Sequence, residues 1–401
     1  MGTLLPLRTV NKQENNHHLR VFHSSAAASL LALQKREIKQ RKRVVLALGK
    51  SLPQGIPVTL QIGDEDNIPD IAMTGWLPPV ASLLTAYEDW QKPYQQGFTC
   101  SDGFVSRLST PAAQVTNLSV QEIWQRCCLA EEILVRRINQ WLNSELFRPV
   151  RETLLAYCHP RESIRLILQT DDLQIQKLPL HRWDWFDRYS QAELILGSNT
   201  YAQADGRSNS QFTAHPRILA VLGDSQGLDI EHDVALLKNL PNAAVTCLRE
   251  PMRSQLNEAL WDNPWDIILF AGHSECANHA QCQTKFQLNA HESLSLNELK
   301  YGLKRAIAQN LKLLILNTCD SLTLLKELSR ELNNNLCLPA TIAMRQPVPD
   351  VVAQTFLRYF LTPFSQGQTL PCSVREAREK LQGIEHQFPF ASSIPVLYQT
   401  L

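Results

Sequence analysis

The chain has 401 residues, with 39 basic and 39 acidic side chains, so it carries no net charge at neutral pH. A neutral protein has no overall field that would attract nucleic acid or an anionic membrane surface, and we expect neither as a partner. No stretch of the sequence approaches the roughly 18 apolar residues that a membrane span needs. The ten cysteines are scattered and follow no secretory signal pattern, which predicts reduced thiols in a cytoplasmic protein.

The first part of the chain is predicted to be a basic extension over residues 1–43, disordered or partly helical. It holds nine Lys or Arg against two Glu, and its cluster at residues 35–43 also leaves open a tether to an anionic surface or to nucleic acid. An α/β region is expected over residues 44–150. Its predicted elements are a strand over 58–63, a turn over 75–79, a helix over 83–90 and a longer helix that starts at the capping box Ser119–Glu122.

The second part of the chain alternates strands and helices. Strands are expected over 164–168 and 194–196, and a polar stretch over 198–212 predicts a surface loop. Beyond residue 216 the predicted strands are 217–222, 243–248, 266–271, 312–317, 340–344 and 394–398, with helices between them. This order predicts a doubly wound, mostly parallel sheet with helices on both faces.

Reactive side chains follow two of these predicted strands directly. His273 comes after the apolar run 265–271, and Cys319 comes after the run 311–316. Ligands and chemistry gather at the carboxyl ends of strands in such sheets, so neighbouring strands would bring an imidazole to a thiol. A thiol is a weak nucleophile until it ionises, and a nearby imidazole both promotes ionisation and can protonate a leaving amine. The pair therefore predicts nucleophilic catalysis.

The motifs at these two strand ends resemble those of the CHAT domain, a family of caspase-like cysteine peptidases. The resemblance rests on Phe270-Ala271-Gly272-His273-Ser274 and Asn317-Thr318-Cys319-Asp320-Ser321. It continues through residues 178–183, 343–350, 374–378 and 394–397. It implies a CHAT domain over residues 151–401 with a caspase-like catalytic core over 216–401, preceded by a non-catalytic α/β partner region.

The resemblance also implies roles for individual residues. His273 would be the base and Cys319 the nucleophile of a cysteine endopeptidase that cuts a protein substrate under the control of a regulatory partner. The backbone N–H groups of Gly272 and Cys319 would stabilise the oxyanion. Asn317, Asp320 and Arg345 are candidates for the substrate pocket, where Arg345 would suit an acidic side chain or would simply be a surface residue at a strand end. No metal or cofactor is expected.

Two alternatives remain open from the sequence. The chain would be a binding module if the caspase-like scaffold keeps its dyad but only recruits partners. It would be a zinc-binding regulatory protein if the ligand-type side chains at three-residue intervals hold a metal. Those side chains are His273, Cys276, His279 and Cys282.

Overall fold

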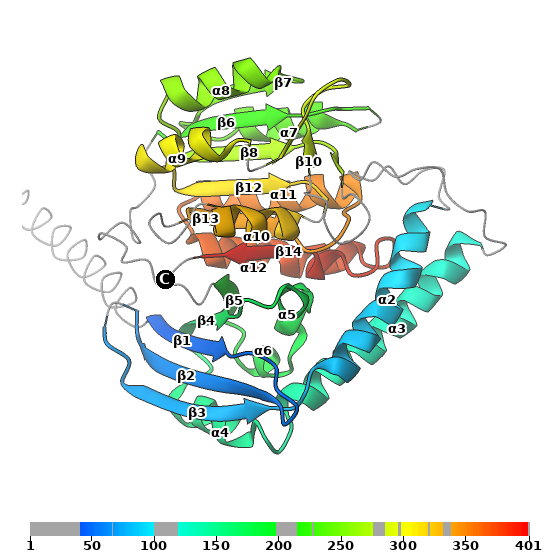
Figure 1. The fold of residues 1–401 in the computed structure, drawn as a ribbon, viewed down its shortest axis with the longest axis vertical. Coiled ribbons are helices and arrows are strands. Elements are labelled where there is room, and N and C mark those ends of the chain that lie inside the picture. Colours follow the sequence, from blue (N-terminus) through cyan, green and yellow to red (C-terminus); the bar gives the residue numbers. More distant parts are fainter. Residues whose placement is uncertain are drawn as a thin grey trace, which may run out of the picture.

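The computed structural model describes residues 41–65, 67–99, 119–197, 215–226, 228–275, 285–295, 298–319, 321–331 and 338–399. Within these residues, 11 strands form one sheet in the order β3-β2-β1-β4-β5-β14-β13-β12-β8-β6-β7 (Figure 1). Most neighbouring strands are parallel, and the antiparallel pairs are β1–β2, β2–β3 and β13–β14. We call residues 41–197 the first half and residues 215–399 the second half.

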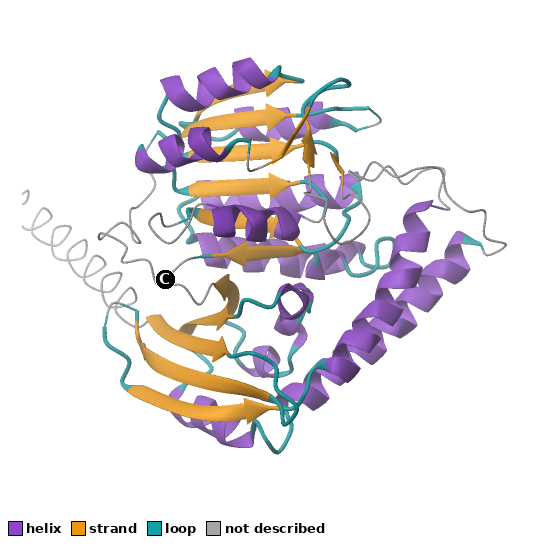
Figure 2. Ribbon diagram, viewed as in Figure 1, coloured by secondary structure: helices purple, strands orange, loops and turns teal. Residues whose placement is uncertain are grey.

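The second half carries six strands of the large sheet and the helices between them. Its strands are β6 (Arg217–Leu222), β7 (Ala244–Arg249), β8 (Ile267–Ala271), β12 (Leu313–Asn317), β13 (Ala340–Met344) and β14 (Pro395–Tyr398). Its α-helices are α7 (Ile230–Lys238), α8 (Arg253–Asp262), α9 (Lys300–Ala308), α10 (Ser321–Glu331), α11 (Asp350–Ser365) and α12 (Leu370–Leu381). β8, β12 and β13 are buried almost throughout, because helices cover both faces of the sheet (Figure 2).

The first half adds five strands and a pair of long helices. Its strands are β1 (Arg41–Leu48), β2 (Ile56–Asp64), β3 (Ile71–Leu77), β4 (Ser163–Gln169) and β5 (Ala192–Gly197). Its helices are α2 (Ala81–Thr99), α3 (Val120–Leu142), α4 (Arg148–Tyr157), α5 (Leu173–Lys177), η1 (Leu180–Arg182) and α6 (Trp185–Arg188). α2 and α3 lie side by side and extend from the first half toward the second (Figure 1).

Three short strands form a second sheet between β8 and α9. They are β9 (Ser274–Glu275), β10 (Lys285–Gln287) and β11 (Ser293–Ser295), in the order β11-β10-β9. The backbone N–H of Gln287 donates to the carbonyl of His273 over 3.0 Å, and the N–H of Asp224 donates to the carbonyl of Gln287 over 3.0 Å. This small sheet therefore fixes the backbone of the segment that follows β8.

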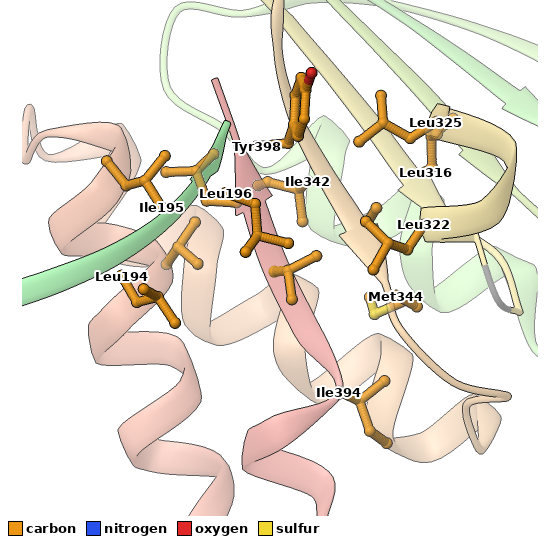
Figure 3. Close-up of a cluster of buried hydrophobic side chains, with 14 of the residues drawn as sticks. Leu194, Ile195, Leu196, Leu316, Leu322, Leu325, Ile342, Met344, Ile394 and Tyr398 are labelled. Carbon is orange, nitrogen blue, oxygen red and sulfur yellow. The ribbon is translucent and has the colours of Figure 1, made fainter. Parts of the chain in front are cut away.

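The two halves meet where β5 lies beside β14. Their pairing is short: Tyr398 is in register with Leu196, and Gln399 N–H donates to the Leu196 carbonyl over 2.9 Å. Apolar side chains from β5, β13, β14 and α10 fill the space around this junction, including Leu196, Ile342 and Tyr398 (Figure 3). Burial of apolar side chains, more than hydrogen bonding between strands, therefore joins the halves.

The structure confirms the predicted fold class, a large and mostly parallel sheet with helices on both faces. Two expected boundaries fall inside elements. The basic extension was expected to end after residue 43, but β1 begins at Arg41 and pairs with β4, where Lys42 Nζ reaches Glu162 over 3.7 Å. A charged side chain at a strand end can keep its charge near solvent, so charge alone does not exclude a strand. The boundary after residue 150 falls within α4.

One local prediction was wrong. The segment 75–79 was expected to be a turn, but Gly75, Trp76 and Leu77 form the end of β3 and pair with β2. A Cβ on Gly75 would lie 2.4 Å from Val150 Cγ2 of α4, so this glycine allows a helix to approach the strand closely. The prediction failed because a close tertiary contact, and not a turn, accounts for the glycine.

Candidate functional site

The two predicted reactive residues lie at the carboxyl ends of neighbouring strands in the large sheet. β8 and β12 are adjacent and parallel, with Ala271 in register with Asn317. His273 and Cys319 each lie two residues beyond that pair, at the carboxyl ends of the two strands. The expectation that these strands are neighbours is confirmed. Parallel strands lie about 4.8 Å apart, so the topology brings the imidazole-bearing and thiol-bearing turns together.

The turn that carries His273 depends on glycine. Gly272 has φ +142°, and an added Cβ would lie 3.1–3.2 Å from the backbone of Gly223, which follows β6. The Gly223 N–H donates to the carbonyl of Ala271 over 2.8 Å. Residues with a Cβ adopt such a φ only with strain, so glycine both permits the turn and lets it press against the neighbouring strand end. The His273 side chain is placed by this contact.

A backbone carbonyl orients the His273 imidazole. Nε2 lies 2.9 Å from the carbonyl oxygen of Gln226. A carbonyl oxygen only accepts hydrogen bonds, so Nε2 is the nitrogen that donates, and Nδ1 is the acceptor nitrogen of a ring with this tautomer. Nδ1 is buried and makes no hydrogen bond with the residues that the structure describes. This tautomer leaves Nδ1 able to accept a proton.

The Cys319 thiol is enclosed by the segment after β13. The residue is 1% exposed. Its Sγ accepts a hydrogen bond from the backbone N–H of Val348 over 3.3 Å and lies 3.8 Å from the Val348 carbonyl oxygen. His273 is 7% exposed, so both side chains are buried. In this conformation the sulfur contacts backbone polar groups of Val348 and very little solvent.

Serine side chains connect the strand ends to each other. Ser274 Oγ donates to the carbonyl of Cys319 over 2.8 Å. Ser321 Oγ, at the start of α10, donates to the Leu316 carbonyl over 2.7 Å and accepts from the Met344 N–H over 2.8 Å. These bonds tie β8 to the turn after β12, and that turn to β13. The arrangement is fixed by buried hydrogen bonds, which are costly to leave unmade.

Two of the three predicted pocket residues are buried. Asn317 is 0% exposed and Arg345 is 1% exposed, while Asp320 lies outside the described residues. The Arg345 guanidinium donates to the carbonyl of Leu178 in the first half. Burial, together with the nearby guanidinium of Arg378, lowers the pKa of Arg345 to about 9. Arg345 is therefore a buried cation and not a surface residue at a strand end.

The predicted zinc ligands cannot be assembled from the described residues, because Cys276, His279 and Cys282 lie outside them. The cysteines that the structure describes are free thiols. They are Cys127, Cys128, Cys158, Cys247, Cys319 and Cys372. Burial raises the pKa of the Cys127 thiol and, to about 11, that of Cys158. Buried thiols of this kind are poor nucleophiles.

Sequence reasoning missed several contributors to the site. Gln226 acts through its backbone carbonyl and Val348 through its backbone N–H, so no pattern of side chains in the sequence predicts either contact. Ser274 stands inside the quoted histidine motif, and its polar side chain directly after the histidine was the available signal. Tyr87 and Trp90 fitted a helical stripe of core residues, and the spacing gave no sign that α2 reaches the segment after β13.

A protein-family model for the CHAT domain matches residues 136–391 of the chain. The match covers well over half of the sequence and contains both strand ends, so the chain belongs to the CHAT domain family. Among the curated proteins compared with the chain, none matches it. The match begins within α3 and includes β4 and β5. The family domain therefore includes part of the first half as well as the whole second half up to η4 (Ala391–Ser393). No helix of the described residues is long and apolar enough to cross a membrane.

Proposed function

We propose that this protein is a cysteine endopeptidase in which His273 is the base and Cys319 the nucleophile. The observation that carries the proposal is the placement of the His273 ring: Nε2 lies 2.9 Å from the Gln226 carbonyl oxygen, and the buried Nδ1 has no hydrogen-bond partner among the described residues, at a strand end beside the turn of Cys319. Membership of a caspase-like family supports the same chemistry. A substrate protein and a regulatory partner belong to this proposal.

The proposed reaction has two steps. Nδ1 of His273 takes the thiol proton, Sγ of Cys319 attacks the carbonyl carbon of the scissile peptide bond, and the imidazolium then protonates the leaving amine. The backbone N–H groups of Gly272 and Cys319 would stabilise the oxyanion of the tetrahedral intermediate. Water, deprotonated by His273, hydrolyses the thioester and releases the new carboxylate with a regenerated thiol.

The specificity part of the proposal concerns Asn317, Asp320 and Arg345. Among the described residues, the hydrogen-bond partners of Arg345 are the backbone carbonyls of Lys177 and Leu178, and none is a carboxylate. A buried cation without an anionic partner favours an acidic ligand, since desolvation strengthens the attraction between opposite charges. An acidic substrate side chain would have to reach Arg345 through a rearranged pocket, because the residue is enclosed here.

A binding module is the second candidate function. The observation that favours it is the burial of both proposed catalytic side chains, at 7% for His273 and 1% for Cys319. A scaffold that recruits partners would need no access to the sulfur. The two candidates differ in whether Cys319 ever reacts in a manner that depends on His273.

The test is labelling with a small panel of peptidyl chloromethyl ketones, followed by mass spectrometry of every cysteine-containing peptide. Because the thiol is enclosed, we expect labelling of Cys319 in the parent to be slow but selective, and to be reduced at least 100-fold further in His273→Ala, since general-base assistance contributes about 10²–10⁴. His291→Ala is the matched control, because His291 is an exposed histidine remote from the strand ends in sequence. Equal labelling of Cys319 in parent and His273→Ala protein would refute the dyad.

A second experiment asks for peptide-bond cleavage itself. A proteome-derived peptide library is incubated with parent, Cys319→Ala, His273→Ala and double-variant protein, and new amino termini are identified. Cleavage should vanish in all three variants to the same extent, because residues that act as one catalytic unit lose activity non-additively. Cleavage that survives in Cys319→Ala would place the nucleophile elsewhere.

A further inference from the structure

The segment that encloses Cys319 is held by a helix from the first half. Tyr87, Gln91 and Tyr94 of α2 are spaced so that they share one helix face. The side-chain oxygen of Gln346 accepts from Gln91 Nε2 over 3.2 Å, and its side-chain nitrogen donates to the Tyr87 hydroxyl. The Tyr94 hydroxyl donates to the carbonyl of Pro347 over 2.7 Å. Three contacts from one helix thus fix two consecutive residues.

The next residue of the same segment contacts the thiol. Val348 places its N–H 3.3 Å and its carbonyl 3.8 Å from Cys319 Sγ. Pro347 and Pro349 stand on either side of Val348, and proline fixes φ, so the segment has few ways to bend between its ends. Any displacement that α2 allows at residues 346–347 is therefore passed to the residue that covers the sulfur.

The segment also reaches the imidazole side of the site. The carboxylate of Asp350, at the start of α11, accepts from the backbone N–H of Asp229 over 3.2 Å. Asp229 caps α7 and follows the stretch that contains Gln226, whose carbonyl holds His273 Nε2. Contacts thus run from α2 through residues 346–350 to Cys319 and to Asp229, which lies three residues after Gln226 in the chain.

The closed arrangement leaves no room for a substrate. A peptide carbonyl carbon has to come within about 3–3.5 Å of the attacking sulfur, yet Cys319 is 1% exposed and Val348 covers Sγ. We infer that α2 is an inhibitory clamp, which holds residues 346–349 over Cys319 until the contacts of Tyr87, Gln91 and Tyr94 are released. The inference rests on the proposed function, because it names how that same site is regulated.

A feature of α2 itself fits this role. Pro93 lies inside the helix, between Gln91 and Tyr94. Proline has no backbone N–H, so one hydrogen bond of the helix is missing at this point. The end of α2 that bears Tyr94 can therefore shift relative to the part that bears Tyr87 without the loss of the helix hydrogen bond that a residue other than proline would make at position 93. The weak point falls between two of the three clamp residues.

The test measures how fast Cys319 of the full chain reacts with iodoacetamide, by mass spectrometry, against the same thiol in urea-unfolded protein. The parent should react far more slowly than the unfolded chain. Tyr94→Phe, which removes only the hydroxyl and its hydrogen bond to Pro347, should react about three- to tenfold faster. Gln346→Ala removes the hydrogen bonds to both Gln91 and Tyr87, so its rate should rise at least as much. Hydrogen exchange of the peptide that contains the Val348 N–H should accelerate by the same factor.

Matched controls separate the clamp from general loosening. Gln95→Ala changes an exposed glutamine on the same helix, and Tyr301→Phe removes a hydroxyl from a tyrosine that is 71% exposed. Both should leave the Cys319 rate unchanged. Hydrogen exchange in β8 and β12 should stay at the parent level in every variant, which shows that the sheet remains folded.

The clamp is overturned if Tyr94→Phe and Gln346→Ala react at the parent rate, or if parent Cys319 reacts as fast as the unfolded thiol. The assay needs only access to the sulfur, so it is repeated with His273→Ala as the background. Suppose that Tyr94→Phe and Gln346→Ala speed alkylation in this background, while peptidyl labelling of Cys319 is the same with and without His273. That result upholds the clamp and refutes the peptidase. His273-dependent labelling without faster alkylation in the variants refutes the clamp alone.

Discussion

Ser274 and Cys319 are joined by a buried hydrogen bond: the Ser274 hydroxyl donates to the backbone carbonyl of Cys319 over 2.8 Å. Ser274 is 0% exposed. The bond connects the residue after the proposed base to the proposed nucleophile, across the ends of β8 and β12. It fixes the relative position of two turns that belong to segments 45 residues apart in the chain.

Replacement of this serine should lower the stability of the fold. Ser274→Ala leaves a buried carbonyl without this donor, so we expect a loss of about 1–2 kcal/mol in unfolding free energy. Urea denaturation measures it. Ser225→Ala, which removes an exposed hydroxyl bonded to Glu250, should cost less than about 0.5 kcal/mol. An equal cost for the two changes would show that the Ser274 bond does not stabilise the fold.

Alanine substitutions at Gly272 and at two other glycines distinguish the cost of backbone strain from the cost of a steric contact. Gly272→Ala should destabilise by about 1–3 kcal/mol, because φ is +142° and the new Cβ would press on Gly223. Gly367 has φ +86° with nothing within 4 Å, so Gly367→Ala should show the cost of conformation alone, about 1 kcal/mol.

Gly383 supplies the baseline for this series. It has open space around its Cβ position and a φ outside the left-handed region, so Gly383→Ala should be neutral or slightly stabilising. Thermal and urea unfolding of the three variants gives the order. A Gly272→Ala variant that is as stable as Gly383→Ala would mean that the turn before His273 can be rebuilt without glycine.

Glu193 predicts a pH-dependent effect on stability. Burial in β5 raises the pKa of Glu193 to about 7, and Arg375 and Arg165 offset this only in part. An unfolded carboxyl titrates near 4.3. Between these values the folded state binds more protons than the unfolded state, so this group lowers stability as the pH rises toward 7.

Glu193→Gln should remove that loss. Relative to the parent, the variant should gain about 1–3 kcal/mol of unfolding free energy between pH 5 and pH 8. Glu376→Gln is the control, because a hydrogen bond from Lys380 lowers the pKa of Glu376 and moves its titration below this window. A parent–variant difference for Glu193 that is flat with pH would disprove the raised pKa.

Phe390 predicts an unusual order of substitutions. The ring is fully buried, its centroid lies 3.9 Å from that of Trp90, and the backbone has φ +72°. Phe390→Ala should cost about 3–5 kcal/mol through the lost ring. Phe390→Gly removes one more carbon but relieves the left-handed strain, so it should be about 1 kcal/mol more stable than the alanine variant. If the alanine variant is the more stable of the two, residue 390 is not strained by its left-handed backbone conformation.

The sequence by itself determined which segments of the second half form the strands of the large sheet. Apolar runs such as 266–271 and 312–317 are long enough for buried strands, and each is followed by polar residues. The sequence therefore predicted both that these strands are buried and where they end. Capping boxes were equally direct: Ser119 and Glu122 exchange the expected hydrogen bonds at the start of α3. The pairing of His273 and Cys319 with adjacent strand ends followed from these local patterns and from the resemblance.

Only the tertiary structure decided how the two halves meet. The contacts of α2 with residues 346–347 join positions more than 250 residues apart in the chain. They involve a backbone carbonyl and a side-chain amide, neither of which leaves a periodic signal. The same holds for Gln226 and Val348, which act through main-chain atoms that every residue possesses. Periodicity reports which face of an element is buried, but not which distant segment covers it.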